Sequence, residues 1–160
     1  MIFVTVGSQK FQFNRLLKTI DALIQKGTIK EDVFAQIGVS DYKPQNYKYT
    51  DFMTQSEFND QLENANIVIT HAGTGVIVNS VKKRKKVIAT PRLKKYGEHV
   101  DDHQIQLIQQ FDELEFIEPL YEINELEKKL KEIRSKEFKI YESNTESIIK
   151  DIKEFIEKGI

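Results

Sequence analysis

The sequence predicts an α/β fold in which a parallel sheet is covered by helices on both faces. Short apolar runs alternate along the chain with segments whose apolar residues recur at helical spacing, the pattern of βαβ units. The apolar runs are continuous rather than alternating, which is typical of strands buried on both sides. The chain has 160 residues, about the size of one domain, so we expect a single domain over residues 1–160.

The first half of the chain contains three expected strands and one helix. Residues Ile2–Val6 ("IFVTV") are apolar and mostly β-branched and predict the first strand. Apolar residues from Phe13 to Ile24 recur every three or four positions and predict a helix that Gly27 ends. A second strand is expected at 32–38 and a short third at 47–52.

The second half continues the alternation. Thr54 and Glu57 form a capping-box pattern, which predicts the start of a helix that continues through Leu62. The remaining expected elements are strands at 66–70, 86–90 and 114–117, with helices around 76–81, 105–108, 126–133 and 148–156.

Composition excludes several classes of function. Lys and Arg total 24 against 25 Asp and Glu, a net charge of -1, which gives no basic excess for nucleic-acid binding. There is no cysteine, so disulfides and thiolate metal sites are excluded. No stretch approaches the ~20 apolar residues of a membrane span, and the first residues lack the basic region of a signal peptide. We therefore expect a cytoplasmic protein.

Three unusual segments follow expected strands: "GSQK" (7–10), "HAGTG" (71–75) and "PRLKKYGEHVDDHQ" (91–104). In open parallel sheets, ligands bind at the carboxyl ends of the strands. The agreement in location predicts a binding site at this edge of the sheet.

The first two segments carry glycines between a strand and a helix. Glycine lets the backbone approach a ligand, and a helix N-terminus offers amide protons to an anion. A plain turn accounts for the first segment equally well, and neither segment has a Walker or a complete G-x-G-x-x-G pattern. Together they predict that two glycine-bearing helix N-termini hold a diphosphate. The residues expected there are Gly7, Ser8, Gln9, His71, Gly73, Thr74 and Gly75.

The third segment is the most polar. His99 and His103 are four residues apart and could share a helix face for a metal, but the H-E-x-x-H order is missing, so we expect no metal. Carboxylates, amides and imidazoles suit the hydroxyls of a sugar, because each gives or takes a directed hydrogen bond. A solvated cap on a helix that starts near Asp101 is the remaining interpretation.

The three segments, in this order, resemble the glycosyltransferase family 28 C-terminal domain. The likeness rests on "FVTVGSQKFQFNRLL", "NANIVITHAGTGVI" and "ATPRLKKYGEHVDDHQIQLI" and extends over Met1–Glu118. It is closest to short members that are soluble subunits of two-part glycosyltransferases in bacterial capsule and exopolysaccharide synthesis. The chain is also similar to the soluble subunit of the enzyme that adds N-acetylglucosamine to a dolichol-linked sugar.

The resemblance implies one half of a GT-B glycosyltransferase, a Rossmann-like domain that binds a UDP-sugar without a metal or other cofactor. It places the first segment near the diphosphate and the second near phosphate and ribose. It places Glu98, His103 and Gln104 near the donor sugar. Family members often have Ser where Val76 stands and an acidic ribose ligand near Asn79; Asn79 can still donate and accept hydrogen bonds.

A complete GT-B enzyme has two such domains, so the resemblance implies a membrane-anchored partner that binds a lipid-linked saccharide acceptor. The expected reaction is inverting transfer of a hexose, galactose or N-acetylglucosamine. No residue of this chain is assigned as the general base, which we expect in the partner. One alternative is a non-catalytic accessory that activates the partner. An NAD-type enzyme would need an acidic ribose ligand about 20 residues past the first segment, and Glu31 and Asp32 are displaced from that position.

The end of the chain is expected to form a helix over 143–158. Its apolar stripe would pack on the sheet of this chain or cross onto the partner. The stripe consists of Ile148, Ile149, Ile152, Phe155 and Ile156. The basic run Lys82–Lys86 is expected to be solvated, with a surface of anionic lipid as the alternative.

Overall fold

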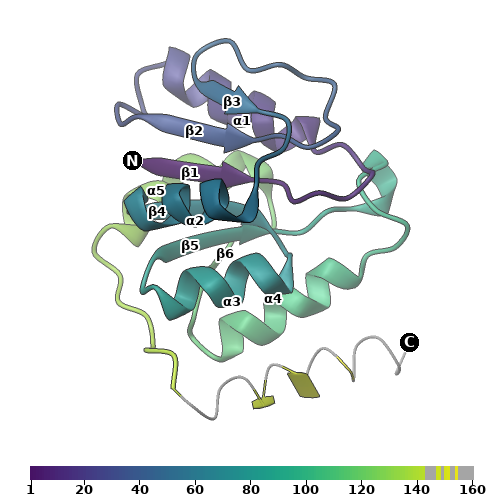
Figure 1. Cartoon of the computed structure of the whole chain (residues 1–160), viewed down its shortest axis with the longest axis vertical. Coiled ribbons are helices and arrows are strands. Elements are labelled where there is room, and N and C mark those ends of the chain that lie inside the picture. The colour runs from purple at the N-terminus through teal and green to yellow at the C-terminus, as the bar shows by residue number, and fades with distance from the viewer. Residues whose placement is uncertain (143–146, 149, 152–153, 155–160) are drawn as a thin grey trace.

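Six parallel strands form one sheet in the order β3-β2-β1-β4-β5-β6 (Figure 1). The computed structural model describes residues 1–142 together with 147, 148, 150, 151 and 154. The strands are β1 (Ile2–Thr5), β2 (Val33–Gln36), β3 (Lys48–Thr50), β4 (Ile67–His71), β5 (Lys86–Thr90) and β6 (Glu118–Pro119). The helices are α1 (Asn14–Gln25), α2 (Gln55–Asn64), α3 (Thr74–Lys82), α4 (His103–Glu113) and α5 (Leu126–Ile133), with 3-10 turns η1 (Lys94–Tyr96) and η2 (Ile123–Glu125).

The strand order reverses between β1 and β4, which are neighbours in the sheet. Thr5 pairs with Thr70 near the carboxyl ends of these strands, while β1 pairs with β2 on its other side. Chain connections therefore leave β1 and β4 toward opposite sides of the sheet. This Rossmann-like arrangement opens a crevice outside the two strand ends, where ligands of such folds bind.

Helices cover both faces of the sheet, as the continuous apolar strands predict. On one face, α1 and α5 pack on alternate strand residues, and this part of the core includes Val4, Leu17 and Leu130 (Figure 1). On the other face α2, α3 and α4 enclose a core that includes Phe3 and Ile77. Because successive residues of a strand point to opposite faces, Phe3 and Val4 belong to different layers.

The sixth strand lies later in the chain than 114–117, and that expectation is wrong. Leu114 and Glu115 still belong to the end of α4, where the Leu114 amide donates to the Gln110 carbonyl at 3.1 Å. Glu115 then adopts a left-handed φ of 61°, and the Phe116 amide donates back to Phe111 at 3.2 Å. This helix-ending turn uses the apolar "LEFI" run and leaves only Glu118–Pro119 to pair with β5.

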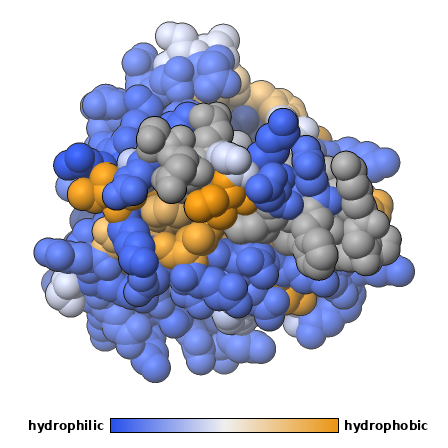
Figure 2. All heavy atoms as spheres, turned by 90° about the horizontal axis from the view of Figure 1, so that it is seen from below, coloured by the Kyte–Doolittle hydropathy of each residue, from blue (hydrophilic) through white to orange (hydrophobic). Residues whose placement is uncertain are grey.

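The expected C-terminal helix over 143–158 lies for the most part outside the described residues. Apolar side chains of described residues gather on the face seen in Figure 2. Leu114, Phe116, Ile140 and Ile148 line a pocket. Across the part of the chain that the structure describes, no helix has the length and apolar character required to cross a membrane.

Candidate functional site

A pocket of about 370 Å³ lies at the carboxyl ends of β1 and β2 and beside the start of α3. It brings together the first two segments singled out from the sequence, because β1 and β4 are neighbours. Its walls are Thr5, Gly7 and Ser8 around the end of β1, Gln36 at the end of β2, Met53, Thr54, Gln55 and Phe58 around the start of α2, and Gly75, Val76 and Asn79 on α3.

The N-terminus of α3 presents backbone amides at this pocket that have no acceptor among the residues that the structure describes. The first backbone bond at the start of the helix runs from the Ile77 amide to the Gly73 carbonyl at 3.0 Å. Gly73, the N-cap, has no side chain that could accept from the amides of the first turn of α3. The amides of Thr74, Gly75 and Val76 therefore precede the helical ladder, and the helix dipole adds a partial positive charge. This end of α3 suits an anion.

Neither the backbone conformation nor a neighbouring residue requires glycine at position 75. The φ of Gly75 lies outside the left-handed region, and a Cβ built on it would meet no atom within 4 Å. Glycine is also a poor helix former, costing about 1 kcal/mol relative to Ala in a helix interior. Since Gly75 lines the pocket, its missing side chain leaves room for a ligand close to the backbone.

Gly7 and Gly73 have a different role. A Cβ on either residue would come within 2.6 Å of Nε2 of His71, so both loops pack directly on this imidazole. His71 is 3% exposed, and burial, with smaller contributions from Arg92 and His99, lowers the pKa of His71 to about 3. The imidazole is therefore neutral at physiological pH.

The expectation of two glycine-bearing helix N-termini at the site is wrong. The helix after β1 begins only at Asn14, seven positions beyond Gly7, and its first amides are used elsewhere. The Phe13 amide donates to Ser40 Oγ at 3.0 Å, and the Asn14 amide donates to Gln12 Oε1 at 2.8 Å. Residues 6–13 form a loop because their side chains and carbonyls bind other loops.

Gln36 lines the pocket and was not predicted from the sequence. The Gly7 amide donates to Thr5 Oγ1 at 3.3 Å, and this hydroxyl donates to Gln36 Oε1 at 3.0 Å. The Gly7 amide and the side-chain carbonyl oxygen of Gln36 are thus both engaged within the protein. The NH₂ group of Gln36 has no protein partner among the described residues and remains a donor at the pocket. A polar residue at the end of a buried strand was the available signal.

The remaining predicted residues differ in their relation to the pocket, and Gln9, His71, Gly73 and Thr74 are not among the residues that line it. Ser8 and Gln9 are exposed, and Ser8 is part of the pocket wall. Asn79 lies one helical turn after Gly75, so both residues face the pocket from α3. Val76, where a hydroxyl was expected from the family pattern, contributes its backbone amide and an apolar side chain.

The buried side chain of Arg92 connects the loop after β1 to the third segment. Nη1 of Arg92 donates to the carbonyls of Phe11 and Gln12 at 3.0 and 3.2 Å and to that of Glu98 at 3.2 Å. Nη2 donates to the Val6 carbonyl. Burial lowers the pKa of Arg92 to about 10, and the nearby Glu98 acts in the opposite direction. Arg92 therefore stays charged at neutral pH and holds the β1 loop in place.

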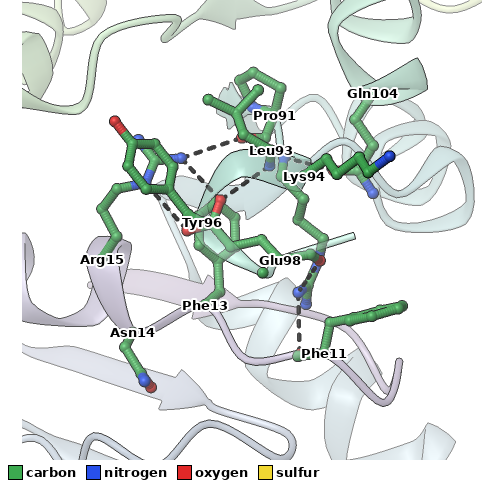
Figure 3. A network of polar contacts seen from close by, with 12 residues as sticks. Phe11, Phe13, Asn14, Arg15, Pro91, Leu93, Lys94, Tyr96, Glu98 and Gln104 are labelled. Carbon is green, nitrogen blue, oxygen red and sulfur yellow. Dashed lines mark hydrogen bonds and ion pairs between the residues drawn. The ribbon is translucent and has the colours of Figure 1, made fainter. Parts of the chain in front are cut away.

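Glu98 is buried and its carboxylate is paired within the chain (Figure 3). Arg15 donates to both of its oxygens at 3.0 Å, and the Leu93 amide donates to Oε1 at 3.0 Å. Gln104 is likewise engaged, since its Oε1 accepts from the amides of Ala72 and Arg92 at 3.2 and 2.9 Å. Both residues, expected near the donor sugar, hold the loops together in this structure.

His103 is half-buried at the start of α4. Asp101 lies between two imidazoles, 3.0 Å from Nδ1 of His99 and 3.3 Å from Nδ1 of His103, and accepts from the His103 amide at 3.0 Å. Partial burial raises the pKa of Asp101, but the His103 amide and the two imidazoles outweigh this and lower it overall. The segment therefore caps α4. Among the residues that the structure describes, no group of three or more His, Asp or Glu side chains could hold a metal.

Comparison with known proteins identifies the family. Residues 1–158 match the sequence profile of the glycosyltransferase family 28 C-terminal domain. The chain belongs to this family. A curated relative of this glycosyltransferase family 28 C-terminal domain is the UDP-N-acetylglucosamine transferase subunit ALG13 of Candida albicans, 32% identical over 90 residues. That alignment covers 56% of this chain and 29% of the relative.

Solved structures show the same fold for this family 28 domain. The solution structure of ALG13 has a TM-score of 0.62 at 20% identity and covers 98% of this chain and 96% of that one. The glycosyltransferase of kitacinnamycin has a TM-score of 0.63 at 15% identity, and MurG of Acinetobacter baumannii 0.54 at 14%. This chain spans 38% and 49% of those two proteins, which is the share of one half of a GT-B glycosyltransferase.

Proposed function

We propose that this chain binds the UDP-sugar donor of a two-component inverting glycosyltransferase. A membrane-anchored partner would supply the acceptor-binding half and the general base, and the acceptor would be a lipid-linked saccharide. The observation that carries the proposal is Gly75, a helical glycine with open space where its side chain would stand, at the unpaired amides of α3.

The pocket suits each part of a nucleoside diphosphate. The amides of Thr74, Gly75 and Val76 would donate to the diphosphate. Asn79, one turn further along α3, would bind a ribose hydroxyl, and the NH₂ group of Gln36 provides a further donor. Met53 and Phe58 offer apolar surface at the same pocket for the base.

This arrangement favours departure of UDP. As the bond between the sugar and the diphosphate breaks, negative charge grows on the leaving oxygens. Fixed backbone amides and the dipole of α3 stabilise that charge without reorganising during the reaction. Because these donors can stabilise the leaving group, we propose a reaction without a metal ion.

The donor sugar is proposed from the relatives. The relative from Candida albicans is a UDP-N-acetylglucosamine transferase subunit, which favours N-acetylglucosamine, with galactose as the other candidate. The resemblance to short bacterial family members supports a place in capsule or exopolysaccharide synthesis.

Calorimetric titration with UDP, UDP-N-acetylglucosamine and UDP-galactose, each with EDTA or Mg²⁺, tests the proposal. The wild-type chain is expected to bind in EDTA. Gly75→Ala should fold with equal stability or gain up to about 1 kcal/mol, yet bind UDP at least about tenfold more weakly because the methyl group fills ligand space. Lys83→Ala, at the opposite end of α3, is the matched control and should bind normally. Normal binding by Gly75→Ala would contradict the proposal.

The same variant separates a donor-binding subunit from an accessory. Transfer assays with the partner should lose activity in Gly75→Ala if this chain holds the donor. An accessory that only activates the partner would retain transfer in Gly75→Ala.

A further inference from the structure

The side-chain amide of Gln104 has a fixed orientation. Its Oε1 accepts from two backbone amides, those of Ala72 at 3.2 Å and Arg92 at 2.9 Å. Both partners are donors only, so the oxygen must face them and the NH₂ group must face the other way. Gln104 is 4% exposed, which leaves no space in which the amide could turn to solvent.

That orientation determines the protonation of His71. Gln104 Nε2 lies 3.4 Å from His71 Nδ1. An amide NH₂ can only donate, so Nδ1 must be the accepting, unprotonated nitrogen. A neutral imidazole carries one proton, which is then on Nε2.

Nε2 of His71 lies between the two glycine loops. Nε2 is 2.6 Å from the positions where a Cβ would stand on Gly7 and on Gly73. No acceptor for this proton is found among the residues that the structure describes, although His71 is 3% exposed. Nε2 is not one of the fully buried side-chain atoms that lack a partner, so water can accept this proton until a ligand supplies the acceptor.

We propose that Gln104 is a positioning residue that holds His71 in its Nε2–H form, so that the neutral imidazole donates to an anionic oxygen of the bound diphosphate. The part about the ligand rests on the function proposed above. The role differs from the sugar contact that the family resemblance implies for Gln104. The charged or titratable groups that act on the ring are Arg92 and His99, and both disfavour a second proton on it.

The tautomer can be measured without a ligand. Nitrogen-15 NMR of the His71 ring in the wild-type chain should show a protonated Nε2 and an unprotonated Nδ1. In Gln104→Glu, one oxygen can still accept from Ala72 and Arg92, while the other accepts rather than donates at Nδ1. The proton should therefore move to Nδ1 at high pH. A wild-type ring protonated on Nδ1 would overturn the proposal, even if the variant does not fold.

Ligand binding provides the second readout. UDP-N-acetylglucosamine should bind the wild type with constant affinity between about pH 5 and pH 8, since His71 stays neutral. In Gln104→Glu the carboxylate raises the pKa of His71, so the ring donates from Nε2 only while doubly protonated. The affinity of the variant for UDP-N-acetylglucosamine should fall about tenfold or more as pH rises, because one hydrogen bond to a charged group is lost. Gln110→Glu, further along α4, is the charge-matched control and should keep a flat profile.

Identical pH profiles for wild type and Gln104→Glu would overturn the role of Gln104. Absence of wild-type binding, together with the Nε2–H form by NMR, would instead overturn the proposed donor-binding function and the ligand half of this proposal.

Discussion

The imidazole of His71 lies so close to Gly7 that a Cβ on Gly7 would stand 2.6 Å from Nε2. A Cβ on Gly73 would stand at the same distance from Nε2. The spacing between the loops after β1 and β4 is therefore set by one buried side chain. Gly7 and Gly73 resemble phosphate-loop residues in the sequence. In the structure, both must be glycine because they pack directly on His71.

Gly7→Ala should destabilise the fold. Gly7 has a left-handed φ of 75°, which costs an L-residue about 1–2 kcal/mol, and the new methyl group overpacks against His71 at about 1–3 kcal/mol. Urea unfolding should show a total loss of roughly 2–5 kcal/mol. When Gly7→Ala is made in a His71→Ala background, the loss from overpacking against His71 should disappear. The loss from the left-handed φ of residue 7 should remain. Wild-type stability of the single variant would contradict this account.

Glu98 and Arg15 should be strongly coupled in a double-mutant cycle. Their pair is buried and bidentate, with side-chain exposures of 1% for Glu98 and 18% for Arg15. Breaking such a pair leaves an unpaired buried charge, and Glu98→Gln should cost about 3 kcal/mol in unfolding free energy. The exposed pair Lys83–Glu63 is the control, with a coupling of at most about 1 kcal/mol. Equal couplings for the two pairs would show that Glu98 does not hold the loop.

Gln36→Glu should separate binding from folding. The carboxylate can still accept from Thr5 Oγ1, but it replaces a donor at the pocket with a negative charge. We expect UDP affinity to fall at least about tenfold, because one charge-assisted hydrogen bond is lost. Gln61→Glu adds the same charge on α2 away from this pocket and should bind UDP normally in the same titration. Unchanged affinity in Gln36→Glu would remove Gln36 from the site.

His71 should make the fold sensitive to acid. Its pKa is about 3 in the folded chain against about 6.5 unfolded, so the unfolded state binds more protons between these values. The contribution of His71 to the free energy of unfolding is fully present above about pH 6.5. It falls as pH decreases, by up to about 1.4 kcal/mol per pH unit. Urea unfolding of wild type and His71→Asn over this range should show a shallower pH dependence in the variant. Parallel curves would contradict the neutral buried state, since other groups are common to both proteins.

Much of the fold follows from local sequence. The β-branched runs gave the central strands, the Thr54–Glu57 capping box is present as expected, and α5 spans the expected residues Leu126–Ile133. These features depend on neighbours within a few positions. The end of α4 could not be predicted from local sequence. Whether "LEFI" forms a strand or a helix-ending turn depends on packing with distant parts of the chain.

The pocket lies at the edge of the sheet that the sequence singled out, while the role of its residues in binding stays a prediction. Strand order brought the glycine segments together, and the free amides of α3 agree with the expectation for Gly75. The partners of Glu98 and Gln104 could not be foreseen: Arg15 lies 83 positions from Glu98, and His71 lies 33 from Gln104. Polar residues suited to a sugar are equally suited to bind each other once the fold brings loops together.

The two edges of the sheet end in strands that offer little to an added strand. At one edge, β3 has only three residues and begins with Lys48; at the other, β6 has two and ends with Pro119, which lacks an amide proton. Short, charged or proline-bearing edges discourage intermolecular strand pairing. A protein that docks on this domain must therefore approach its helices or the loops at the strand ends, and the open pocket can coexist with a sheet that resists aggregation.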